Sequence, residues 1–88
     1  MDSIFKKMFK MSDLPLDTFQ AIPKITLYGN NDLIVENFRG IVEYTENLIR
    51  LNTSIGLLVI RGVGLKLVEI TREDLLIEGQ VLIIEIRK

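Results

Sequence analysis

From Ile25 to Ile86 the chain reads, run after run, ITLYG (25–29), LIVEN (33–37), GIVEY (40–44), LIRLN (48–52), IGLLVIRG (55–62), LKLVEI (65–70), LLIEG (75–79) and VLIIEI (81–86). Valine, isoleucine and leucine recur in these runs with a period of two. Glycine, asparagine or charged residues interrupt them every six to ten residues. Apolar runs with this period and these interruptions are typical of a compact antiparallel β protein.

The pattern predicts seven or eight short strands after Lys24, at about residues 24–28, 32–37, 40–45, 47–52, 55–61, 65–70, 74–78 and 80–87. Turns are expected at 29–31, 37–40, 45–47, 52–54, 62–64 and 71–73, because glycine and asparagine accept the positive φ of tight hairpins. Gly79 joins two apolar runs with scarcely any linker, so we expect a bulge or sharp bend there. The expected fold is a twisted antiparallel meander or small roll.

The predicted core takes apolar residues from every strand. Its members are Ile25, Leu27, Leu33, Val35, Ile41, Leu48, Leu51, Leu57, Val59, Leu67, Ile77, Ile83 and Ile86. A slip of one residue in register would exchange the two faces of a strand. Residues 57–60 and 81–86 are apolar on both faces, which is typical of strands that are covered on both sides. The cover could come from the sheet folding over itself, from N-terminal helices or from another subunit.

The N-terminus differs from the rest of the chain, so we expect an amphipathic basic segment at 1–11 and a single β domain at 12–88. The segment places Ile4, Phe5, Met8 and Phe9 at helical spacing, with Lys6, Lys7 and Lys10 mostly on the other side. Such a helix suits docking on a membrane or a partner. The alternatives are a terminal helix packed on its own domain and a disordered tail. A second short helix is expected from Leu14 or Pro15 to Gln20 or Ala21.

Composition excludes several classes of protein. The 88 residues, 48% hydrophobic and 26% charged, suffice for one folded domain. The chain has no cysteine and no histidine, so it lacks disulfides, thiol nucleophiles, zinc ligands and the commonest general base. A net charge of −1 argues against a nucleic-acid-binding protein. No apolar run approaches the roughly 20 residues of a membrane span, and the N-terminus lacks the apolar core of a signal peptide, so a cytoplasmic location is expected.

The remaining polar residues predict no enzyme and no cofactor. The acidic residues stand at strand spacing among lysines and arginines, which is typical of a solvated face with cross-strand ion pairs. Gly62-Val63-Gly64 resembles the start of a phosphate loop, but no lysine and no helix follow in the required places. We therefore expect a hairpin turn at these glycines.

Four stretches together resemble a known protein family. They are residues 22–30 (IPKITLYGN), 35–40 (VENFRG), 59–62 (VIRG) and 75–79 (LLIEG). The likeness is to the YqfC-like branch of the YabP/YqfC sporulation proteins, and it extends over about residues 11–88. Glu36-Asn37-x-Arg39-Gly40 is its most specific element.

The resemblance implies a small, non-enzymatic protein that is made in the mother cell and needed for spore development. It implies no catalytic residues, and it suggests a membrane protein of the YqfD type as a partner. The motif residues are expected to be structural: Gly29, Glu36, Asn37, Arg39, Gly40, Gly62 and Gly79. Gly29 and Gly40 are expected at positive φ, Asn37 is expected to close a turn through its amide, and Arg39 to bind carbonyl groups.

Two functions fit these observations. The first is a structural or scaffolding protein that self-associates or docks on a membrane partner at the developing forespore. The second is a β module that binds a small ligand or a carbohydrate. The mass in solution separates them, since a dimer or larger assembly favours the first and a monomer with a deep polar pocket favours the second.

Overall fold

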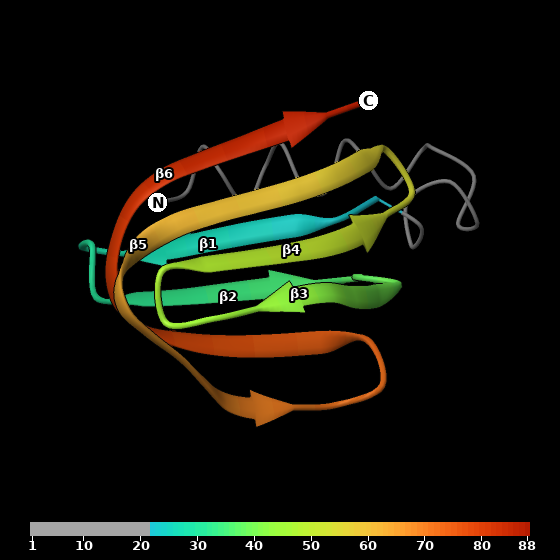
Figure 1. Ribbon diagram of the computed structural model, residues 1–88. Coiled ribbons are helices and arrows are strands. Elements are labelled where there is room, and N and C mark those ends of the chain that lie inside the picture. The colour runs from blue at the N-terminus through green and yellow to red at the C-terminus, as the bar shows by residue number, and fades with distance from the viewer. Residues whose placement is uncertain (1–21) are drawn as a thin grey trace, which may run out of the picture.

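The computed structural model describes residues 22–88, which form one antiparallel sheet of six strands (Figure 1). The strands are β1 (Lys24–Tyr28), β2 (Asp32–Glu36), β3 (Gly40–Tyr44), β4 (Leu48–Thr53), β5 (Gly56–Ile70) and β6 (Asp74–Arg87), in the spatial order β1-β2-β6-β5-β4-β3. The prediction of an antiparallel all-β fold is confirmed. The predicted N-terminal helices and the basic segment 1–11 lie outside the described residues.

The sheet is folded into two layers by the long β5–β6 hairpin. Residues 57–63 of β5 pair with 80–87 of β6, and residues 66–70 of β5 pair with 75–78 of β6. Of the two long strands, β4 pairs with the first part of β5 alone, and β2 pairs with the first part of β6 alone. Layer A therefore contains β3, β4, the N-terminal half of β5 and the C-terminal half of β6. Layer B contains β1, β2, the N-terminal half of β6 and the C-terminal half of β5. Figure 1 shows the hairpin curving from one layer into the other.

Three glycines permit the bend in this hairpin. Gly64 and Gly79 have φ of 63° and 129°, which side chains rarely accept. A Cβ on Gly79 would lie 2.5 Å from the carbonyl oxygen of Gly64, and a Cβ on Gly62 would collide with the carbonyl oxygen of Gln80. The bend expected at Gly79 is confirmed. The turn expected at Gly62-Val63-Gly64 is wrong, because these residues continue β5 through the bend.

The strand count of seven or eight is consequently too high. The predicted strands 55–61 and 65–70 are two halves of β5, and 74–78 and 80–87 are two halves of β6. Backbone pairing across the bend keeps each long strand continuous, with register shifts at the glycines rather than chain reversals.

Two turns brace the bend from either side. Asn47 lies between β3 and β4, and its side-chain Nδ2 donates to the carbonyl of Gly62 at 3.1 Å. In return, Gly62 N–H donates to the backbone carbonyl of Asn47 at 3.1 Å. On the other side, between β1 and β2, the carbonyl of Asn31 accepts from Gly79 N–H at 2.9 Å. The carbonyl of Asn30 accepts from Val81 N–H at 2.8 Å. Both turns thus satisfy backbone groups that the bend removes from the sheet ladder.

The core lies between the layers. Its buried members are Leu33, Val35, Ile49, Leu51, Leu58, Ile60, Leu65, Leu75, Ile77 and Val81, with Ile25, Phe38, Leu67 and Ile84 packed against them. Among the predicted core residues, Leu33, Val35, Leu51, Val59 and Ile77 are buried, and Ile25, Leu48, Leu57 and Leu67 are half-buried. The prediction is wrong for Leu27, Ile41, Ile83 and Ile86, which are exposed. Leu27 and Ile41 lie on edge strands, where less of the sheet covers them. Ile83 and Ile86 lie on β6, which is apolar on both faces, so the sequence did not show which face of that strand points inward.

Candidate functional site

Four strand segments are paired on one side only within residues 22–88. β1 and β3 are the ends of the strand order, while the C-terminal halves of β5 and β6 pair only with each other's first halves. We call β1 with residues 81–87 of β6 the β1/β6 margin, and β3 with residues 66–70 of β5 the β3/β5 margin. Figure 1 shows the first margin as the upper strand of each layer and the second margin as the lower strand of each layer.

Exposed apolar side chains collect on these margins. Of the twelve large apolar residues exposed in the described part of the chain, ten lie on the four margin segments. They are Leu27, Tyr28, Leu82, Ile83 and Ile86 on the β1/β6 margin, and Ile41, Val42, Tyr44, Val68 and Ile70 on the β3/β5 margin. An edge strand with exposed apolar residues and unpaired backbone groups is a surface on which another chain can add. The sequence showed which residues are apolar but not which strands are edges.

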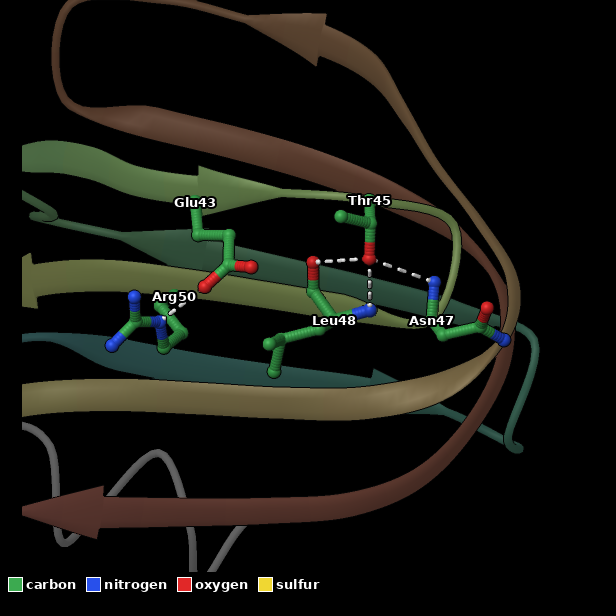
Figure 2. Close-up of polar contacts among 5 residues, drawn as sticks. All are labelled: Glu43, Thr45, Asn47, Leu48 and Arg50. Carbon is green, nitrogen blue, oxygen red and sulfur yellow. Dashed lines mark hydrogen bonds and ion pairs between the residues drawn. The ribbon is translucent and has the colours of Figure 1, made fainter.

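Polar contacts stabilise the β3 end of the β3/β5 margin (Figure 2). Arg50 Nε donates to Glu43 Oε1 at 2.7 Å across β3 and β4, and Thr45 Oγ1 accepts from the N–H of Asn47 and of Leu48 at 3.2 and 2.9 Å. The ion pair is partly exposed, so it contributes only about 0–1 kcal/mol. The threonine bonds fix the turn that carries Asn47 to the bend.

The motif Glu36–Gly40 connects layer B to layer A. Asn37 takes a φ of 64°, and its side-chain Nδ2 donates to the carbonyl of Ile22 at 2.9 Å, so the bond joins the motif to the residues just before β1 rather than closing the turn itself. Phe38 N–H donates to the Glu73 carbonyl at 3.1 Å, and Phe38 packs against the core. Arg39 reaches the Asn52 carbonyl at 2.7 Å through its backbone N–H. The motif is therefore a junction between layers.

The glycines of the motif region behave differently from one another. Gly29 has a φ of 60°, which confirms the expectation for that turn. The expectation of positive φ at Gly40 is wrong, because Gly40 begins β3 in ordinary strand geometry and the positive φ falls on Asn37. Asparagine tolerates this conformation better than other residues with a side chain.

A prediction follows for the junction. Asn37→Ala is expected to destabilise the domain by about 1–3 kcal/mol, because it loses an amide bond and places alanine at positive φ. Asn37→Gly relieves the conformation but still loses the bond, so it is expected to cost less. Gly40→Val is expected to be nearly neutral, within about 0.5 kcal/mol, since a Cβ there meets nothing within 4 Å. Urea denaturation of the three variants measures this order, and a larger loss for Gly40→Val than for Asn37→Ala would contradict it.

The described surface also has a shallow depression of about 180 Å³ on layer B. It is lined by Ile34, Glu69, Thr71, Asp74, Leu75 and Leu76. Thr71 is engaged in its own turn, where its backbone N–H donates to the Asp74 carbonyl at 2.8 Å. Within residues 22–88 no group of three acidic side chains is arranged to hold a metal ion, and no helix is long and apolar enough to cross a membrane. The predicted docking residues 4–10 lie outside this range.

Comparison with known proteins agrees with the resemblance seen in the sequence. The profile of the YabP family matches residues 20–87. The chain is also 32% identical over 69 residues to the uncharacterized protein YqfC of Bacillus subtilis (strain 168), an alignment that covers 78% of this chain and 74% of that protein. No solved structure matches the fold significantly. With a match that spans all six strands, the chain belongs to the YabP family.

Proposed function

We propose that this protein is a non-enzymatic structural or scaffolding factor in spore formation. It acts in the mother-cell cytoplasm at the forespore membrane, by self-association or by docking on a membrane partner such as a YqfD-type protein. The resemblance of the sequence motifs to sporulation proteins supports the biological setting, and membership of the YabP family agrees with that resemblance.

The observation that carries the molecular part of the proposal is the apolar character of the two margins. Within residues 22–88, ten of the twelve exposed large apolar side chains lie on strand segments that have no neighbour on one side, where strand addition supplies backbone hydrogen bonds and side-chain contacts together. A protein that works by joining other chains needs this kind of surface. A protein that works by binding a small ligand needs a concave site with converging polar groups instead.

Removing the gene from its host, and testing whether that host still forms spores, tests this proposal. The yield of heat-resistant spores is expected to fall and to return when the wild-type gene is restored. An unchanged yield would contradict a role in sporulation. Binding of cell-wall oligosaccharides to the purified monomer, measured by calorimetry, would support the ligand-binding module instead.

Deletion of residues 1–10 tests the docking segment. Ile4, Phe5, Met8 and Phe9 would contribute about 1.5–3 kcal/mol each on burial, before ordering costs, and the three lysines about 1 kcal/mol each near an anionic bilayer. That total suffices for reversible attachment. The truncated protein is therefore expected to leave the membrane fraction while its thermal melt stays nearly unchanged. Unfolding of the truncated domain would show that the segment is part of the core and would contradict docking.

A further inference from the structure

The two margins differ in how far irregular pairing and occupied backbone groups hinder the addition of another strand. Both strands of the β3/β5 margin carry a register shift, between Ile41 and Glu43 in β3 and between Leu67 and Glu69 in β5. In addition, Tyr44 Oη accepts the N–H of Leu67 at 3.1 Å. Bulges and occupied edge groups obstruct the addition of another strand.

The β1/β6 margin is more regular. β1 pairs with β2 without a shift over all of residues 24–28, and β6 pairs with β5 without a shift over residues 83–87, the irregularity falling at Leu82. Leu82 and Ile83 are also 60% and 50% exposed, and Tyr28 is 57% exposed. Of the two margins, this one is the better surface for edge-to-edge pairing.

Strand directions on this margin allow two copies of the chain to pair. The bend makes the two halves of β6 run in opposite directions in the two layers, and β1 lies two antiparallel strands away from the N-terminal half of β6. β1 therefore runs opposite to the C-terminal half of β6, as the arrowheads in Figure 1 show. A two-fold rotation about an axis along the strands exchanges the layers and keeps strand directions. It brings β6 of each copy antiparallel to β1 of the other.

The side chains match in this arrangement. Aligning Lys24 of one copy with Glu85 of the other places opposite charges across the joint, twice in a symmetric dimer. The same register pairs Ile25 with Ile84, Thr26 with Ile83, Leu27 with Leu82 and Tyr28 with Val81. Ile25 and Ile84 both pack toward the core, whereas Lys24, across from Glu36, and Glu85, across from Val59, lie on the opposite faces of their strands. The faces of the two strands thus agree over Lys24–Thr26 and Ile83–Glu85, whereas beyond the irregularity at Leu82 the exposed Tyr28 meets the buried Val81.

We infer that the β1/β6 margin is the self-association interface of this protein. A second copy adds β1 to the C-terminal half of β6, and β6 to β1, so that each layer continues from one copy into the other. The inference rests on the proposed function, because it identifies the surface through which the scaffold associates with itself.

A charge exchange at the joint tests this interface in the full-length chain. Lys24→Glu alone and Glu85→Lys alone each place like charges together twice, so each is expected to weaken the dimer by about tenfold or more. Mixed in equal amounts, the two variants restore opposite charges at both positions. They are therefore expected to form a 1:1 heterodimer that is tighter than either homodimer, as measured by sedimentation velocity.

A matched pair of apolar variants tests which margin is used. Leu82→Lys on the β1/β6 margin is expected to yield a folded monomer, while Val68→Lys on the β3/β5 margin leaves the dimer unchanged. A wild-type protein that stays monomeric at high concentration, or a mixture of charge variants that fails to associate, would overturn the interface. Dissociation caused by Val68→Lys but not by Leu82→Lys would also overturn it. A large fall in the melting temperature of Leu82→Lys would overturn it as well, because it would show that this edge is covered within a single chain. The spore-yield experiment does not depend on these results, so the interface can fail while the proposed function stands.

Discussion

Gly79→Ala is expected to destabilise the domain by about 3 kcal/mol or more, which is a large part of the roughly 5–15 kcal/mol that holds a small domain folded. Two effects act together at this position. Its φ of 129° lies where side chains are strained, and a Cβ there would lie 2.5 Å from the Gly64 carbonyl oxygen and 2.8 Å from Leu65 Cα. Both neighbours are backbone atoms of the facing strand, so neither can move aside without opening the bend. Urea denaturation followed by circular dichroism measures the loss.

Two other glycines separate the two effects. Gly64 has a φ of 63° and free space around a Cβ, so Gly64→Ala is expected to cost only about 1–2 kcal/mol from backbone strain. Gly62 lacks positive φ but lies against the Gln80 carbonyl. The loss of stability in Gly62→Ala therefore measures the collision of the added Cβ without backbone strain. Gly79→Ala is expected to exceed Gly64→Ala clearly. Equal melting curves for these two variants would show that the halves of the hairpin do not approach each other as closely as described.

Ile60→Ala is expected to cost about 2–5 kcal/mol, because it opens a cavity in the centre of the core. Ile60 is fully buried and pairs with Ile49 on β4 and with Ile84 on β6. The surrounding residues come from both layers, so the site has little freedom to collapse around a smaller side chain. The free energy of unfolding, extrapolated from urea titrations, measures the effect.

The matched control is Ile83→Ala, which removes the same atoms from a half-exposed position. Its expected cost is below about 1 kcal/mol. The sequence analysis placed Ile83 in the core and omitted Ile60, so this pair also tests the assignment of faces. Both variants are measured below the concentration at which copies associate, and a greater loss at Ile83 than at Ile60 would then restore the sequence-based assignment.

The local pattern of residues determined the fold class and most of the chain reversals. The run KITLY predicted β1 at the residues where the structure has it, and β2 and β3 were predicted to within one residue at each end. Turns at 29–31, 45–47 and 71–73 also fall between strands as predicted, whereas the turn predicted at 52–54 lies at residues 54–55, after the end of β4. These features depend on alternation, on positive φ at Gly29, and on hydrogen bonds that Thr45 and Thr71 accept from nearby backbone N–H groups, all of which act over only a few residues.

Tertiary structure decided the features that matter for the candidate site. Gly62-Val63-Gly64 could serve a turn or a bend, and contacts with Gln80 and Asn47, both far along the chain, selected the bend. The inward face of β5 followed from pairing with β4, since both faces of that strand are apolar. The margins depend on strand order, because a strand such as VLIIEI is an edge or a centre only by virtue of its neighbours. Short-range propensity determined where the strands lie, whereas long-range backbone pairing decided which of them are left with an open edge.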